Sequence, residues 1–275
     1  MIKRVMTMLI GIAVLVAIFV LDGLKIVDAP IFFNVALTIV SLMMMKEFYT
    51  AVENKGVKPI KYFGYLTCLS IIPIGLVKPE IITFIYFLIL PIMIFASFIK
   101  SIQTNIKINI IDIAVTVFGA IYTMFLLSFM AHTRAIENGG VWYIWLIFGG
   151  AWFTDIFAFL IGKFFGKHKF KKISTNKSWE GSIAGLLGGI TFYLIFTTVL
   201  QNIQICELNL LAMGILGLIV SLISQIGDLA ASSIKRYCDI KDFSDFMPGH
   251  GGVLDRFDSI LFVAPVVYFA LSIML

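Results

Sequence analysis

The chain has 275 residues, of which 60% are hydrophobic and 13% are charged, and its formal net charge is +5 at pH 7. A soluble domain typically carries about 25% charged residues, so this chain cannot cover its surface with polar groups in water. The composition excludes an ordinary soluble enzyme and indicates a protein embedded in lipid. We expect membrane lipids, and no nucleic acid, among its partners.

Nine apolar runs along the chain are each interpreted as a membrane-spanning helix of roughly 20 residues. They cover residues 5–21, 31–48, 63–77, 81–99, 110–131, 141–161, 182–200, 208–234 and 257–274. The first run follows Lys3 and Arg4, but it is long for a signal peptide and no small-residue cleavage pattern follows it. We therefore predict an all-α polytopic membrane protein with about nine transmembrane helices.

The basic residues predict how the chain is oriented in the membrane. If the N-terminus is cytoplasmic, all of the 21 lysines and arginines lie in inside segments except Lys25, Lys78 and Arg134. This alternation persists through all nine runs, as the positive-inside rule requires. The pattern predicts a cytoplasmic N-terminus, an outside C-terminus and a multi-pass protein of the cell (inner or plasma) membrane.

Two polar loops on the predicted cytoplasmic side are longer than a connection requires. They cover residues 162–181 and 235–256. We predict two regions from this: N-terminal helices in residues 1–133, which serve as scaffold or dimer contact, and a C-terminal catalytic region in residues 134–275. The active site is expected to face the cytoplasm.

Asp228 lies inside the eighth apolar run, where a carboxylate at membrane depth is costly and usually faces a cavity, a partner or an ion. The free-energy cost of burying this carboxylate in the membrane favours a functional role for Asp228. Other polar residues share its face of the helix by i±3, i±4 or i±7 spacing. They are Ser221, Ser224, Gln225, Ser232 and Lys235. For the serines and the glutamine, hydrogen bonding between helices is an equally good interpretation.

A glycine-rich segment with two acids, PGHGGVLDRFD, covers residues 248–258. Its glycines, Gly249, Gly251 and Gly252, allow close approach of the backbone to a ligand or a positive φ. Asp255 and Asp258 share a helical face, and free N–H groups at the start of that helix would bind an anion. Carboxylate oxygens suit Mg²⁺ bound together with substrate phosphates. A tight turn with a charged cap is the structural alternative.

The loop after the sixth run is strongly basic. Lys167–Lys172 forms a cluster that we attribute mainly to contact with anionic lipid headgroups. Ser174–Gly181 has the mixed composition of a binding loop, and it contains Lys177, Ser178 and Glu180. Asp155, near the cytoplasmic end of the sixth run, could pair with Lys163 or bind a metal.

The segment from Ser232 to Asp258 resembles the signature of the phosphatidate cytidylyltransferases, also called CDP-diacylglycerol synthases. The matching residues are Ser232, Ile234, Lys235, Arg236, Lys241, Asp242, Pro248, His250, Gly251, Gly252, Asp255, Arg256, Phe257 and Asp258. Upstream, Gln225–Leu229 and Asp155–Ala158 are also similar to the family. Ser174–Gly181 resembles a family loop whose usual proline is missing here, and Lys46–Tyr49 is a weaker N-terminal match.

The resemblance implies the reaction of CTP with phosphatidate to give CDP-diacylglycerol and pyrophosphate, and it implies a homodimer. It also implies a Mg²⁺ centre between Asp228 and Asp255, with K⁺ as a second ion in some members. Asp258 and Asp155 are further candidate metal ligands. We assign Lys235 and Arg236 to stabilisation of the developing charge. The candidate substrate-binding residues are Lys177, Ser178, Glu180, Ser232, Lys241, His250 and Arg256.

Two other functions are compatible with parts of the sequence. A membrane transporter would suit intramembrane Asp and Gln, but no internal repeat is found and the polar residues gather at one face. A CTP-dependent lipid kinase or an archaeal-type lipid cytidylyltransferase would share the phosphate site and differ in the lipid pocket.

Overall fold

The computed structural model describes residues 17–18, 22, 30–137, 139–169, 177–247, 249 and 251–275. Within these residues the regular structure is entirely helical, and extended backbone pairs only in isolated bridges. The first predicted helix, at 5–21, lies almost wholly outside the described residues. The prediction of an all-α protein is therefore confirmed for the part of the chain that can be described.

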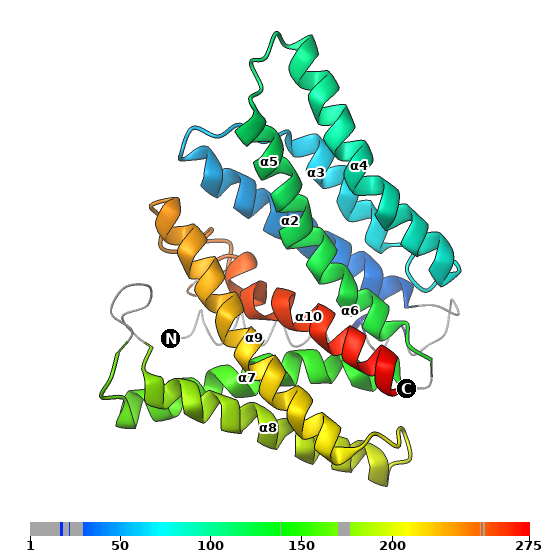
Figure 1. Ribbon diagram of the computed structural model, residues 1–275, viewed down its shortest axis with the longest axis vertical. Coiled ribbons are helices and arrows are strands. Elements are labelled where there is room, and N and C mark those ends of the chain that lie inside the picture. The colour runs from blue at the N-terminus through cyan, green and yellow to red at the C-terminus, as the bar shows by residue number, and fades with distance from the viewer. Residues whose placement is uncertain are drawn as a thin grey trace. The chain divides into compact units, whose positions relative to one another are not determined.

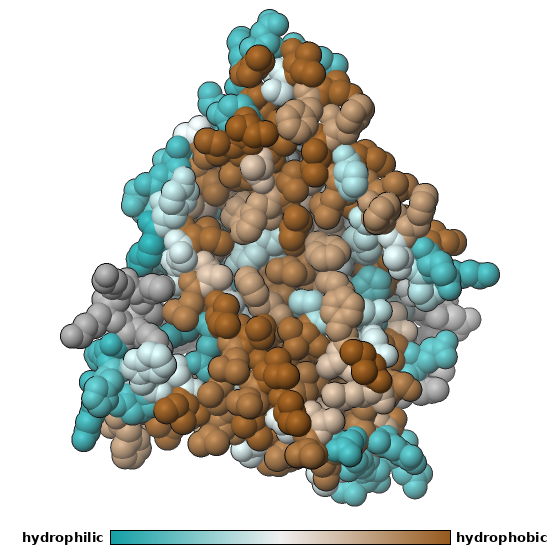
Figure 2. All heavy atoms as spheres, in the orientation of Figure 1, coloured by the Kyte–Doolittle hydropathy of each residue, from teal (hydrophilic) through white to brown (hydrophobic). Residues whose placement is uncertain are grey.

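Seven described segments are long and apolar enough to cross a membrane. They are α2 (Ile31–Glu53), α4 (Pro79–Gln103), the continuous segment Ile110–Arg134, α7 (Gly140–Phe165), α8 (Trp179–Asn202), α9 (Leu210–Tyr237) and α10 (Leu254–Met274). Figure 2 shows apolar side chains over most of the face in view, as expected for contact with lipid. A polytopic membrane fold is confirmed, whereas its orientation stays a prediction.

The third predicted run, 63–77, does not form a helix of spanning length. It contains only α3 (Lys61–Cys68) and the 3-10 turn η1 (Leu69–Ile71). An eight-residue helix rises about 12 Å, against a hydrocarbon core of about 30 Å. Pro73 explains the early end, because it has no N–H to continue the helical hydrogen bonds.

The same segment nevertheless runs along α2. At one end, Lys61 Nζ lies 2.8 Å from Glu53 Oε2, at the last residue of α2. At the other end, the Asn34 side chain near the start of α2 donates to the carbonyls of Ile72 and Ile74 at 3.2 and 2.6 Å. The chain therefore passes along this helix, but as a short helix followed by turns.

The chain forms two compact units, and their boundaries differ from the predicted regions. The first unit contains Met1–Ala135 together with Lys235–Arg256. The second contains Ile136–Ile234 together with Phe257–Leu275. The predicted cytoplasmic loop 235–256 thus belongs with the N-terminal helices, although the functional division of the two regions stays a prediction.

In the first unit, α2 packs against the segment Ile110–Arg134, which consists of α5 (Ile110–Gly119), the π-helical turn η2 (Ala120–Phe125) and α6 (Leu126–Arg134). The Tyr49 hydroxyl of α2 donates to the Thr116 carbonyl at 2.8 Å. A β-carbon at Gly119 would lie 2.4 Å from the Tyr49 ring. The absence of a side chain at Gly119 is therefore what lets α2 lie this close.

Figure 1 shows α7, α8 and α9 of the second unit as ribbons. Small residues lie where these helices pack against one another. A β-carbon at Gly189 of α8 would lie 1.8 Å from Ser221 Oγ of α9. Ser221 in turn receives a hydrogen bond of 3.0 Å from Thr154 of α7. Small residues and interhelical hydrogen bonds of this kind hold membrane helices together, because lipid provides no hydrophobic force between them.

Candidate functional site

A cavity of about 650 Å³ lies in the second unit, near the C-terminal end of α7 and the start of α8. Its volume is in the range of small-molecule sites. Its lining contains Asp155, Ala158, Phe159, Gly162, Lys163, Gly166, Lys169, Lys177, Ser178, Gly181, Ser182 and Gln225. Three lysines against one aspartate make this cavity basic, so it suits an anionic ligand. Asp155, Lys163, Lys177, Ser178 and Gln225, which the sequence analysis considered for binding or pairing, therefore share one cavity.

Lys177 joins this cavity to Asp228 through an ion pair between Lys177 Nζ and Asp228 Oδ2. Both side chains are 29% exposed, so neither is sealed from solvent or from a substrate. One turn earlier on α9, Gln225 Oε1 accepts a hydrogen bond of 2.6 Å from Ser182. The polar stripe of α9 therefore serves two purposes: Ser221 and Gln225 join helices, and Asp228 carries a charge beside the cavity.

Ser178 and Glu180 are organised by the local structure of their loop. Ser178 is the N-cap of α8, and its hydroxyl accepts from the Gly181 N–H at 3.1 Å. Glu180 Oε1 lies 2.7 Å from His168 Nδ1. This contact connects the start of the loop, after α7, to the first turn of α8. His168 received no role from the sequence. The middle of the loop, including residues 174–176, lies outside the described residues.

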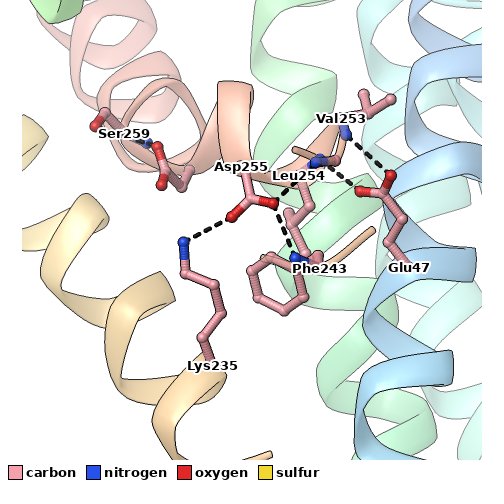
Figure 3. A network of polar contacts seen from close by, with 9 residues as sticks. Glu47, Lys235, Phe243, Val253, Leu254, Asp255 and Ser259 are labelled. Carbon is pink, nitrogen blue, oxygen red and sulfur yellow. Dashed lines mark hydrogen bonds and ion pairs between the residues drawn. The ribbon is translucent and has the colours of Figure 1, made fainter. Parts of the chain in front are cut away.

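In the first unit, Asp255 is the centre of a hydrogen-bond network (Figure 3). Its Oδ1 receives a bond of 2.6 Å from Lys235 Nζ. Its Oδ2 receives bonds of 2.9 Å from the Phe243 N–H and 3.0 Å from the Gly252 N–H. The side chain is 3% exposed. The structure thus brings Lys235 and Asp255, two predicted catalytic residues, into direct contact.

Glu47, in the C-terminal half of α2, completes the same network (Figure 3). Its Oε1 accepts from Ser244 Oγ at 2.5 Å and from the Val253 N–H at 2.9 Å. Its Oε2 accepts from the Leu254 N–H at 2.7 Å. Glu47 is 197 to 207 residues away from these partners along the chain, so sequence spacing did not indicate this contact. The weak family match at Lys46–Tyr49 was the only signal that could have found it.

These contacts correct one expectation about the start of α10. The N–H groups at the start of this helix were predicted to be free for an anionic ligand, and those of Gly252, Val253 and Leu254 lie there. They are instead taken by the carboxylates of Asp255 and Glu47. The segment forms a turn whose amides are capped by charged side chains: Gly249 and Gly251 have φ of 79° and 80°, and a bridge joins Met247 to Gly251.

For most of the remaining predicted residues, the structure gives the exposure to solvent and no contact within the site among the residues that it describes. Arg236, Lys241 and Arg256 are exposed, and Ser232 is half-buried. Asp258 is buried, and its Oδ1 accepts from the Ser259 N–H at 2.7 Å. His250 lies outside the described residues. Close to the same loop, Lys55 pairs with Asp239, and this hydrogen bond raises the pKa of Lys55. The pair joins the residues just after α9 to those just after α2.

The residues proposed for Mg²⁺ fit the ion in kind. Asp228 and Asp255 offer the hard oxygen ligands that Mg²⁺ prefers, and this ion is often held by one or two carboxylates together with substrate phosphates. Within the described ranges, no three His, Cys, Asp or Glu side chains form a ready cluster. Each carboxylate is paired with a lysine, Lys177 or Lys235, and the two belong to different units.

Comparisons with known proteins cover most of the chain. The model of the Cytidylyltransferase family matches residues 2–274. A phosphatidate cytidylyltransferase of Bacillus subtilis (strain 168) is 34% identical over 200 residues, which are 72% of this chain and 70% of that protein. One of Synechocystis sp. is 26% identical over 299 residues, covering 99% of this chain and 97% of that protein. One of Staphylococcus aureus (strain COL) is 37% identical over 164 residues, covering 58% and 60%.

Proposed function

Because the chain belongs to the cytidylyltransferase family, we propose that it is a phosphatidate cytidylyltransferase, which converts CTP and phosphatidate to CDP-diacylglycerol and pyrophosphate. The observation that supports this most directly is the basic cavity of about 650 Å³, lined by Lys163, Lys169 and Lys177 at the ends of apolar helices. A triphosphate needs cationic groups, and a lipid substrate needs a site that is reached from the membrane.

In the proposed reaction, an oxygen of the lipid phosphate attacks the α-phosphorus of CTP. A new P–O bond forms, the bond from the α-phosphorus to the bridging oxygen breaks, and pyrophosphate leaves with that bonding pair. Both substrates are anions, so their repulsion is the main obstacle. The cavity lysines would reduce it on the nucleotide side, and Lys235 and Arg236 would stabilise charge developing on the transferred group.

The proposal includes Mg²⁺ held by Asp228 and Asp255, with Asp155 and Asp258 as further candidate ligands. When bound, the ion would neutralise the CTP phosphates. Lys177 and Lys235, which pair with these carboxylates, would then be available to contact substrate phosphates. K⁺ as a second ion, a homodimer and a cytoplasmic site in the plasma membrane belong to the same proposal, and the resemblance and the distribution of basic residues support them.

Purified protein in detergent, given labelled CTP, phosphatidate and Mg²⁺, tests the activity. Formation of CDP-diacylglycerol and pyrophosphate is expected. Phosphorylated lipid together with CDP would instead indicate a kinase, and no turnover would contradict both.

The variant Asp255→Asn tests the metal assignment. It removes the charge that would hold the ion, and we expect at least a ~100-fold loss of kcat and a higher Mg²⁺ requirement. The Mg²⁺ dependence of the rate is the measurement, with Asp245→Asn, an exposed acid of the same loop, as control. Near-normal activity at low Mg²⁺ in Asp255→Asn would show that the assignment is wrong.

A further inference from the structure

Glu47 is a buried carboxylate in the weaker family match Lys46–Tyr49, and the proposed reaction assigns it no role. It is only 7% exposed, on a helix that crosses the first unit. Its three hydrogen-bond donors all come from the segment 244–254, and two of them are backbone N–H groups at the start of α10. Glu47 therefore touches the loop that carries the candidate site, and it does so from another part of the chain.

The charge of Glu47 is balanced by this segment and not by an ion pair. Among the described residues, no lysine or arginine lies within ion-pair distance of it. A buried charge is costly unless it is hydrogen-bonded. The N-terminus of a helix carries partial positive charge, and an acid that bonds its free N–H groups is stabilised there. The N–H groups at the start of α10 therefore stabilise the Glu47 carboxylate in its buried position. The same hydrogen bonds hold the start of α10 in place.

Asp255 is the first residue beyond the two amides that Glu47 binds. Glu47 takes the N–H groups of Val253 and Leu254, while Asp255 takes those of Gly252 and Phe243. The two carboxylates thus bind successive amides of one turn (Figure 3). A shift of Glu47 would release Val253 and Leu254 and would change the direction in which the Asp255 side chain leaves the helix.

We propose that Glu47 is a positioning residue of the enzyme, which fixes the segment 243–254 and thereby the orientation of Asp255 toward Lys235. This inference rests on the proposed function, because Asp255 matters for catalysis only if the site acts as described. Glu47 acts through its neighbours and is not assigned any contact with substrate. It also gives the N-terminal helices a role beyond scaffold, since α2 supplies part of the support of the site.

The main test compares Glu47→Gln with Glu53→Gln. The first variant keeps the shape of the side chain but replaces one acceptor oxygen by an NH₂ group that faces backbone donors. The second neutralises an acid of the same helix that pairs with Lys61, and both of these side chains are 39% exposed. We expect kcat per folded molecule to fall about 10- to 100-fold in Glu47→Gln, with KM for both substrates changed less than about threefold. Glu53→Gln should stay within about twofold of the wild type.

Hydrogen exchange provides a measurement that does not depend on turnover. In Glu47→Gln, peptides covering 243–256 should exchange about tenfold faster, because the amides of Val253 and Leu254 lose their acceptor. Peptides of α7 and α8 should be unchanged. Ser244→Ala, which removes a single one of the three bonds, should show a smaller effect of the same kind: a few-fold lower kcat and faster exchange near residue 244.

Two results would overturn the proposal. The first is that Glu47→Gln has the same kcat per folded molecule as the wild type and the same hydrogen-exchange rate in residues 243–256. The other is faster exchange throughout the chain with activity lost only in proportion to unfolded protein, which would mean a merely structural role. If Glu47→Gln does not fold, the same two outcomes are read from Ser244→Ala. If the wild type does not turn over, the proposed function fails, while the exchange contrast still decides whether Glu47 holds the loop.

Discussion

At Gly252, a β-carbon would lie 2.6 Å from Oε2 of Glu47 and 2.8 Å from its Oε1. Such distances are too short for real contacts, so the missing side chain is what lets Glu47 reach the backbone of the next two residues. The neighbouring Gly251 has a different reason, since its φ of 80° is in the left-handed region. Two adjacent glycines of one motif thus serve two separate physical purposes, the approach of a carboxylate and a turn.

The variant Gly252→Ala should therefore imitate the loss of Glu47. The new methyl group would push the carboxylate off its three partners, at a cost of about 1–3 kcal/mol for the buried groups left without a bond. We expect kcat to fall to a similar extent as in Glu47→Gln, with little change in substrate KM. Gly214→Ala is the control, because there the nearest atom is a methyl group of Leu194 at 3.3 Å. Equal activity of the two variants would contradict the close contact.

At the scale of the element, the packing of α8 on α9 depends on Gly189 and Ser221. A β-carbon at Gly189 would lie 1.8 Å from Ser221 Oγ, whose hydroxyl donates to the Gly217 carbonyl at 2.7 Å. Ser221 cannot turn away without losing this bond and its bond from Thr154. The helices that line the basic cavity are therefore held at a distance that this glycine permits.

We expect Gly189→Ala to destabilise the second unit by about 1–3 kcal/mol, as overpacking of an interior does. Thermal unfolding in detergent would measure the loss. The double variant Gly189→Ala/Ser221→Ala should recover part of the stability, because it removes the clashing oxygen. Strictly additive losses in the double variant would show that the two residues do not meet.

At the scale of the whole molecule, the predicted orientation can be tested at Lys78 and Lys107, which are exposed at the two ends of the segment that contains α4. In a protein with Cys68, Cys206 and Cys238 replaced by serine, a single cysteine is introduced at either position. With a cytoplasmic N-terminus, Lys78→Cys should react with a membrane-impermeant maleimide on intact cells. Lys107→Cys should react only after the membrane is opened. The reverse pattern would contradict the predicted placement of these two positions.

This test also bears on the third apolar run. Its helical part is only α3 and η1, yet its ends lie beside the two ends of α2. If the run crosses despite its turns, the alternation of basic residues is preserved beyond it. If it does not cross, Lys78 and Lys107 both exchange sides.

The sequence by itself determined the membrane class, the helical fold and the family resemblance. These depend on composition, on the length of apolar runs and on residues at short spacing, as in Ser232–Asp258. It also selected Asp228, because a carboxylate at membrane depth is costly and needs a reason. Lys235, Lys177 and Asp255 were selected by helical spacing, by the composition of their loops and by the family resemblance. Hydropathy could not reveal where Pro73 ends a helix within an otherwise apolar run.

Only the tertiary structure decided which of these residues meet. Lys177 pairs with Asp228, Lys235 pairs with Asp255, and Glu47 caps α10, whose free amides were expected to bind an anion. Hydrogen bonds between distant segments depend on how helices pack, and packing leaves little trace in local spacing. Glu47 is the plainest case, since its partners lie 197 to 207 residues away along the chain and its approach depends on the space that Gly252 leaves open.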